Sequence, residues 1–259
     1  MSLYISIRIN MNEIKIYNEN EFEKIKNACK LAKSVLDFIE QYVKVGITTD
    51  ELNQLCHQYI IDHKAIPAPL NYNGFPKSIC TSVNDVVCHG IPCDYQLKSG
   101  DIINIDITVN LNGYYGDTSR TFLVGKCSKL AENLVNITER ALFVGIDAVK
   151  PYGHFGDIGI AIQKFVDKFG FSIVRDYCGH GIGNVFHGEP TILHYASCWQ
   201  GAQIIPGMCF TIEPMINTGG YKTKVLHDNW TAVTVDKSLS AQFEHTIFVS
   251  ENSVEILTQ

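Results

Sequence analysis

Residues 100–109 read GDIINIDITV, and this stretch decides the fold. Isoleucines recur at every second position and share one face, while Asn104, Asp106 and Thr108 share the other. Alternation with a period of two predicts a β-strand that buries one face. The carboxylate of Asp106 therefore stands in a strand that is otherwise suited to a hydrophobic core.

A second segment repeats this pattern. Residues 207–216 read GMCFTIEPMI, and an ungapped alignment with the first stretch places Glu213 on Asp106. Residues 43–60 align with residues 149–166 at nearly the same shift. The order helix, helix, strands thus occurs twice. This predicts an internal duplication in which Asp106 and Glu213 are related by a pseudo-twofold axis.

Capping patterns predict where the first helices begin. Asn20 followed by Glu23, and Thr48 followed by Glu51, have the spacing of a capping box, and apolar residues recur behind each at helical spacing. A further helix is expected around residues 134–149.

The predicted fold class is α+β. Asn112-Gly113 marks a short turn between two strands, which favours antiparallel pairing over the crossover connections of a parallel sheet. We expect a single domain over residues 1–259, with halves at about 20–125 and 128–252 packed about the pseudo-twofold axis.

Composition bounds the possible functions. The 259 residues carry a formal net charge of -6 and show no basic stripe, which argues against nucleic-acid binding. Nine cysteines without a CxxC pair are typical of small core residues in a reducing compartment. No apolar run is long enough to span a membrane, and residues 1–20 lack the features of a signal peptide. We therefore expect a cytoplasmic protein without a membrane or a specific nucleic acid among its partners.

Four carboxylates lie in apolar segments, where a lone charge is costly: Asp106, Asp117, Glu213 and Glu244. Each could simply alternate outward into water. If all four face inward, they repel one another, and cations would remove that conflict. Two divalent metal ions would balance four carboxylates, and a neutral imidazole would add a ligand without charge.

Residues 177–190 read YCGHGIGNVFHGEP and contain His180 and His187 in a run too rich in glycine for a helix. The H-E-x-x-H pattern of zinc peptidases is absent, so a shared site must be built from loop and strand. We interpret the glycines as letting the backbone pass close to a metal. The residues alone leave open which histidine is the ligand, and Glu189 is a candidate catalytic acid.

These motifs closely resemble type I methionine aminopeptidases over about residues 22–257. The resemblance is carried by six ordered segments: SICTSVNDVVCHGIP (78–92), GDIINIDITV (100–109), GDTSRTF (116–122), YCGHGIGNVFHGEP (177–190), PGMCFTIEPM (206–215) and SLSAQFEHT (238–246). It implies the pita-bread fold, in which two related halves surround a curved antiparallel sheet with helices on its outer face.

The resemblance also implies a dinuclear metal site with five protein ligands. Asp117 and Glu244 would bridge the two ions, Asp106 would hold one ion, and His180 and Glu213 would hold the other. Oxygen ligands with a single nitrogen suit Mn²⁺, Fe²⁺ or Co²⁺ and are compatible with Zn²⁺.

Roles in peptide hydrolysis are implied in the same way. A hydroxide that bridges the metals would attack the first peptide bond. Glu213 would carry a proton from the water to the leaving amine, which makes Glu189 peripheral, and His187 would help to stabilise the oxyanion. His89 would contact the scissile amide on its nitrogen side. Without the resemblance, His89 is better explained as an ordinary loop histidine.

An apolar slot for the methionine side chain is implied at five positions: Tyr72, Phe75, Cys80, Phe186 and Trp230. Aromatic and sulfur groups make adaptable contacts with a thioether. Taken singly, each of these residues could equally be part of an ordinary core.

Two residues depart from the family pattern. Pro69 replaces a small or sulfur residue in the wall of the slot, and Tyr152 interrupts a surface turn. The resemblance further implies a site for one monovalent cation, Na⁺ or K⁺, near Asn84, Val86 and Ser240.

The implied activity is release of the initiator methionine from new polypeptides when the second residue is small. A monomer that acts near the ribosome exit is expected, because no zinc-finger extension precedes the catalytic region. Two alternatives are kept. A proline-specific peptidase of the same fold would usually carry a large preceding domain, and a non-catalytic peptide-binding relative would have lost metal ligands.

Overall fold

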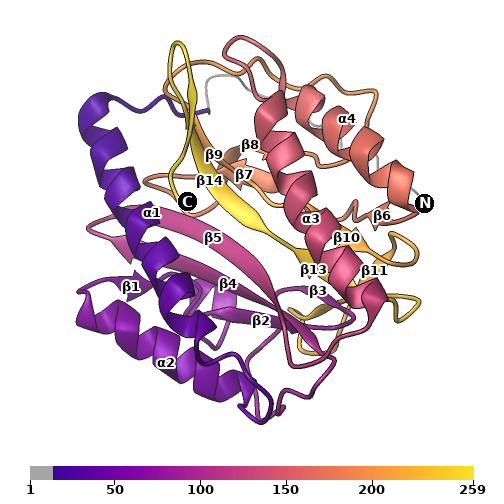
Figure 1. Cartoon of the computed structure of the whole chain (residues 1–259). Helices are drawn as coiled ribbons and strands as arrows, with labels where there is room; N and C mark the ends of the chain where they lie inside the picture. The colour runs from indigo at the N-terminus through magenta and orange to yellow at the C-terminus, as the bar shows by residue number, and fades with distance from the viewer. Residues whose placement is uncertain (1–13) are drawn as a thin grey trace.

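The computed structural model describes residues 14–259 (Figure 1). The prediction that the N-terminal segment is not a signal peptide rests largely on residues 1–13, which lie outside the described residues. Within the described part, no helix is both long and apolar enough to cross a membrane.

The helices of the described chain come in two pairs. The first half supplies α1 (Glu19–Glu40) and α2 (Thr49–Asp62), and the second half supplies α3 (Lys129–Ala148) and α4 (Phe155–Val166). Two short 3-10 helices are also present: η2 (Tyr72–Gly74), which follows the strand at Ile66–Pro67, and η3 (Asp167–Phe169), which follows α4. The matched spacing of α2 and α4 agrees with the predicted repeat.

Helix starts were predicted with mixed success. The capping box of Thr48 and Glu51 is confirmed at α2. The start predicted at Asn20 is wrong, because Asn18 caps α1 and forms the box with Glu21. The earlier box lengthens the helix and places Glu19 and Glu21 in its first turn, where carboxylates interact favourably with the helix dipole. The helix expected around residues 134–149 also begins earlier, behind the cap of Ser128.

A nine-stranded antiparallel sheet runs through both halves in the order β1-β4-β5-β14-β9-β7-β8, with β2 paired to β4 and β15 to β14. Its strands are β1 (Ile66–Pro67), β2 (Cys80–Val83), β4 (Ile102–Leu111), β5 (Tyr114–Leu123), β7 (Gly179–Gly181), β8 (Gly188–Ile192), β9 (Cys209–Ile212), β14 (Glu244–Val249) and β15 (Val254–Ile256). The predicted turn at Asn112-Gly113 joins β4 to β5, which pair along their whole lengths.

Two three-stranded antiparallel sheets complete the structure. One has the order β13-β10-β6, and the other has the order β11-β12-β3. Their strands are β3 (Val86–Cys88), β6 (Ser172–Ile173), β10 (Met215–Asn217), β11 (Thr223–Val225), β12 (Ala232–Thr234) and β13 (Ser240–Gln242). The combination of helices and antiparallel sheets confirms the α+β class.

Helices cover one face of the large sheet. Figure 1 shows α1 lying across β4 and β5, and α3 lying across the strands of the second half. The isoleucine face of β4 is fully buried in a core shared with α1 and α2. A second core joins α3 and α4 to β9 and β14. Each half thus buries its own apolar strands, although the boundaries at residues 125 and 128 stay a prediction.

Reciprocal hydrogen bonds join the halves where β5 meets β14. Thr121 Oγ1 donates to the carbonyl of Gln242 at 2.6 Å, and Thr246 Oγ1 donates to the carbonyl of Asp117 at 2.7 Å. These bonds are related by a local twofold operation that exchanges the two strands. This junction between the halves therefore has the symmetry that the sequence repeat predicts.

The same operation relates the carboxylates in a specific way. Ser119 pairs with Glu244 at the centre of the junction, and Ser119 also pairs with Asp106 on β4. Since Ile212 pairs with His245, Glu213 follows at the level of Glu244. Asp106 and Glu213 are thus equivalent, as predicted.

Glu213 is not inside a strand, however. β9 ends at Ile212, and Pro214 follows Glu213 in the link to β10. Proline has no N–H to give to the ladder, so the strand cannot continue regularly at this point. Glu213 nevertheless lines the cavity between the halves, as its counterpart Asp106 does from inside β4.

Candidate active site

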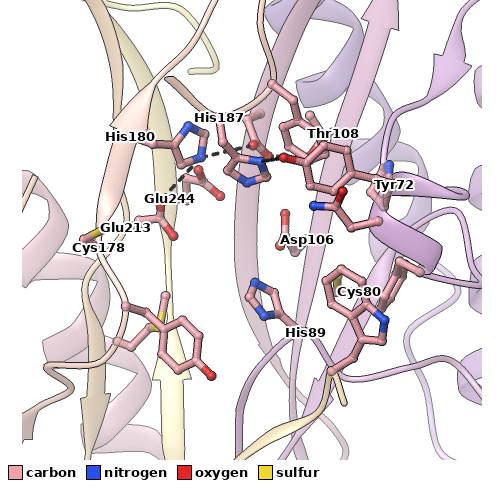
Figure 2. A pocket seen from close by; sticks show the side chains of 18 of the residues that line it. Tyr72, Cys80, His89, Asp106, Thr108, Cys178, His180, His187, Glu213 and Glu244 are labelled. Carbon is pink, nitrogen blue, oxygen red and sulfur yellow. Dashed lines mark hydrogen bonds and ion pairs between the residues drawn. The ribbon is translucent and has the colours of Figure 1, made fainter. Parts of the chain in front are cut away.

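A cavity of about 320 Å³ opens between the two halves (Figure 2). It brings together the predicted metal ligands, the two predicted catalytic histidines and the whole predicted slot. Its walls include Pro69, Tyr72, Phe75, Cys80, His89, Asp106, Asp117, His180, Phe186, His187, Glu213, Trp230 and Glu244. Glu189 does not line it.

Three of the predicted ligands form a compact cluster. Asp117, His180 and Glu244 each offer one ligand atom, and these atoms all lie within 4.8 Å of one another. His180 Nε2 lies 3.8 Å from Asp117 Oδ2 and 3.7 Å from Glu213 Oε1. Asp106 reaches the same cavity from β4. The five predicted ligands therefore converge from five separate segments of the large sheet and its β9–β10 link.

Neighbouring side chains hold the carboxylates in place. Thr108 Oγ1 donates to Asp117 Oδ1 at 2.8 Å. Thr211 Oγ1 donates to Glu213 Oε1 at 2.8 Å, and Gln242 Nε2 donates to Glu213 Oε2 at 3.1 Å. Such partners fix the orientation of a ligand before a metal binds.

Burial makes this cluster of carboxylates unstable as free anions. It raises the pKa of Asp106 to about 7 and the pKa of Glu213 to about 8, even though the cavity keeps Asp106 partly open to solvent. Burial and then the neighbouring carboxylates raise the pKa values of Asp117 and Glu244 well above their usual range. Among the described residues, no lysine or arginine forms an ion pair with any of the four. The donor set therefore fits divalent cations, which would supply the missing positive charge.

His180 has the properties of a neutral metal ligand. Burial lowers its pKa to about 3, with His187 adding to the effect. Its Nδ1 lies 3.1 Å from the carbonyl oxygen of Gly181, which leaves Nε2 toward the carboxylates. A backbone carbonyl on one ring nitrogen is the usual way to orient a metal-binding histidine.

A family model described as metallopeptidase family M24 matches residues 23–251. The chain belongs to metallopeptidase family M24. The methionine aminopeptidase of Rickettsia prowazekii is 55% identical over 246 residues, which cover 95% of this chain and 95% of that protein. Its crystal structure matches with a TM-score of 0.93, and the match covers 95% of this chain and 100% of that chain.

Two further solved structures are similar to this M24 chain. The methionine aminopeptidase of Thermotoga maritima is 37% identical, with a TM-score of 0.92 and coverage of 95% of this chain and 99% of that one. The prolidase of Pyrococcus furiosus is 22% identical, with a TM-score of 0.73 and coverage of 94% and 65%, and shows the fold alone. These similarities confirm the predicted pita-bread fold.

The glycines around His180 serve a different purpose in this M24 site from the one expected. A Cβ on Gly179 would lie 2.4 Å from the carbonyl oxygen of Thr211, and one on Gly181 would lie 2.0 Å from that of Glu189. Both clashes are with the backbone of neighbouring segments and not with residues that line the cavity. The glycines therefore let β7 fit between β8 and β9, and this position brings His180 to the cavity.

The two remaining histidines of the M24 site face the cavity from opposite halves. His89 has a left-handed backbone with φ of 56° and packs edge-on against Tyr177, with ring centroids 5.4 Å apart. Burial lowers the pKa of His89. His187 is open to the cavity, but desolvation by its surroundings, followed by the effect of His89, lowers its pKa to about 4. Both rings are therefore neutral near pH 7 and can each donate one N–H.

The predicted slot is an aromatic wall beside the carboxylate cluster. Phe186 lies 4.7 Å from Tyr72 and stacks on Tyr115 at 5.6 Å, measured between ring centroids. Phe75 meets Trp230 edge-on at 5.2 Å. Offset and edge-on contacts of this kind make a rigid apolar surface. Tyr152, the other departure from the family pattern, is exposed and lies outside this cavity.

Several residues that line the M24 cavity were not predicted from the sequence: Asn73, Thr108, Asp176, Tyr177, Cys178 and Met215. Thr108 had a usable signal, because it shares the polar face of β4 with Asp106. The others lie within four residues of a predicted site residue in the chain, but no periodic pattern distinguishes them.

The residues predicted for a monovalent cation lie apart from this cavity. Ser240 N donates to the carbonyl of Asn84 at 2.9 Å, and the Ser240 hydroxyl is buried without a hydrogen-bond partner among the described residues. Asn84 and Val86 line a second cavity. The structure thus brings Asn84 and Ser240 together, and the cation itself stays a prediction.

Proposed function

We propose that this chain is a methionine aminopeptidase. It hydrolyses the first peptide bond of polypeptides that begin with methionine, with a preference for a small second residue. The substrates would be new polypeptides, so we expect the protein to act in the cytoplasm close to the ribosome exit. We also expect it to be a monomer.

One observation carries the proposal: a single cavity joins the carboxylate cluster to the aromatic slot. The cluster can hold metal ions at one end, and Tyr72, Phe75, Cys80, Phe186 and Trp230 form an apolar surface at the other. An unbranched thioether side chain suits contacts with aromatic rings and sulfur. The names of the relatives from Rickettsia prowazekii and Thermotoga maritima support the same activity.

The metal site is proposed to hold two divalent ions on Asp106, Asp117, His180, Glu213 and Glu244. Mn²⁺, Fe²⁺, Co²⁺ and Zn²⁺ are all compatible with four carboxylates and one imidazole. When bound, such ions polarise the scissile carbonyl and lower the pKa of a water molecule.

The side chains around the metal site would carry the remaining steps. Glu213, held by Thr211 and Gln242, would accept a proton from the attacking water and return it to the leaving amine. His187 would donate its N–H to the carbonyl oxygen as negative charge develops there. His89 would contact the nitrogen side of the same peptide bond.

A turnover assay with several metals tests the proposal. The metal-free protein would be titrated with Mn²⁺, Fe²⁺, Co²⁺ or Zn²⁺ while release of methionine from a Met-Ala-Ser peptide is followed, with elemental analysis of the same samples. We expect methionine release only with metal, and none from Asp106→Ala or His180→Ala. Glu23→Ala, on the exposed face of α1, is the matched control.

The same assay separates the alternatives. Cleavage of Xaa-Pro peptides without release of methionine would favour a proline-specific peptidase. Methionine release that survives both ligand substitutions in the absence of metal would contradict a metal-dependent mechanism. Binding of methionyl peptides with no cleavage under any metal would favour a non-catalytic relative.

A further inference from the structure

A hydrogen bond crosses the cavity between the two halves. His187 Nδ1 lies 3.0 Å from the hydroxyl oxygen of Tyr72, although the two residues are far apart in the sequence. In Figure 2 the His187 ring lies between His180 and Tyr72. This contact gives Tyr72 a second possible role besides forming the wall of the slot.

Both partners of this bond are firmly placed. Tyr72 begins η2, where Asn71 and Asn73 both adopt left-handed backbone conformations that define a tight turn. Its ring packs on Phe186, and Phe186 stacks on the His187 ring with centroids 4.0 Å apart. The hydroxyl is therefore held beside Nδ1 by contacts that do not depend on the hydrogen bond itself.

The direction of the hydrogen bond depends on which ring nitrogen of His187 carries the proton. A neutral imidazole has one N–H and one lone pair, and a phenol can donate or accept. Among the described residues, the Tyr72 hydroxyl has no other acceptor, so donating to Nδ1 satisfies its proton. The reverse arrangement would leave a lone pair on Nε2, which repels a carbonyl oxygen.

We propose that Tyr72 is a positioning residue whose hydroxyl donates to Nδ1 of His187 and keeps the ring proton on Nε2, where it binds the carbonyl oxygen of the scissile bond. This inference rests on the proposed function of the site. It differs from a role in the slot, because it predicts an effect on turnover and not on the binding of the methionine side chain.

The test compares Tyr72→Phe with a matched control. Phenylalanine keeps the ring that packs on Phe186 and removes only the hydroxyl. Tyr115→Phe is the control, because Tyr115 also stacks on Phe186 but does not line the cavity. For a Met-Ala-Ser peptide, we expect kcat of Tyr72→Phe to fall about 10-fold with KM within about twofold, and Tyr115→Phe to match the unchanged protein.

A double-mutant cycle shows whether Tyr72 acts through His187. In a His187→Ala background, Tyr72→Phe should change kcat by less than about twofold, because the group that it positions is gone. An equal loss in both backgrounds would overturn the proposal. So would a rise in KM with unchanged kcat, since that pattern belongs to a slot residue.

The tautomer itself is measured without turnover. A ¹⁵N–¹H correlation spectrum of the metal-free protein, with the His187 signals assigned from His187→Ala, should show the proton on Nε2. Tyr72→Phe should shift the ring toward a mixture of tautomers. A proton on Nδ1 in the unchanged protein would refute the proposal. If the unchanged protein shows the Nε2 proton but releases no methionine with any metal, the proposed function fails and the positioning role stands.

Discussion

Removing the metal ions should expose the electrostatic cost of the carboxylate cluster as a dependence of stability on pH. Burial raises the pKa of Asp106 to about 7 and the pKa of Glu213 to about 8, while unfolded carboxyl groups ionise near pH 4. A group whose pKa is raised in the folded state stabilises it at low pH, and that stabilisation is lost as the pH rises through the folded pKa. The metal-free protein should therefore lose this contribution progressively from about pH 4 to about pH 8, and the part lost between about pH 6 and pH 8 is accessible near neutral pH.

The magnitude follows from the two shifts. One pKa unit corresponds to about 1.4 kcal/mol, and both groups pass from largely protonated toward ionised within this range. Together they should lower the free energy of unfolding by up to about 3 kcal/mol. This is an upper value, because water in the cavity reduces the effect for Asp106.

Buried histidines act in the opposite direction and must be controlled. Burial lowers the pKa values of His180 and His194 to about 3 and of His245 to about 4. A lowered histidine pKa stabilises the folded state above about pH 6.5 and is a cost below it, because the unfolded histidine binds a proton there. The comparison should therefore be made with an Asp106→Asn/Glu213→Gln variant, which keeps these histidines.

The assay is urea unfolding of both chelated proteins at several pH values between about 6 and 8. The difference between the two free energies of unfolding should change by up to about 3 kcal/mol, with the unchanged protein losing stability relative to the variant as the pH rises. Saturating Mn²⁺ should raise the free energy of unfolding of the unchanged protein most strongly at the highest pH. A difference that stays constant with pH would refute the electrostatic account of the site.

Three other substitutions test separate parts of the structure. His187→Ala should lower kcat about 100-fold while elemental analysis finds unchanged metal content, and loss of metal would show that His187 is a ligand. Gly181→Ala should lower the melting temperature by several degrees in circular dichroism, because its Cβ would lie 2.0 Å from the carbonyl oxygen of Glu189, and an unchanged melting curve would contradict that packing. Thr108→Val should weaken metal binding about 10-fold in a calorimetric titration by removing the 2.8 Å hydrogen bond to Asp117, and unaltered affinity would mean that this bond does not orient the ligand.

Local patterns in the sequence predicted much of the fold. The alternation in β4 fixed which face is buried, and the capping box at Thr48 fixed the start of α2, because both depend on residues close together in the chain. The start of α1 was misplaced because Asn18 and Asn20 each stand three residues before a glutamate. The capping rule alone does not choose between two overlapping boxes.

The candidate site was also largely predictable as a set of residues. Charged residues in apolar strands are costly, so their positions mark chemistry even without coordinates. The lining residues Tyr177, Cys178 and Met215 were missed, because nothing in their spacing shows that they face the cavity.

By itself, the sequence determined the two repeated halves, the buried faces of their strands and the types of group available as metal ligands. The tertiary structure alone decided the register that brings Asp117 beside Glu244, the close packing that requires Gly179 and Gly181, and the contact between Tyr72 and His187. The physical reason is the distance along the chain over which each interaction acts. Periodicity and capping are properties of neighbouring residues, whereas the pairing of β5 with β14 depends on how both cores pack at once.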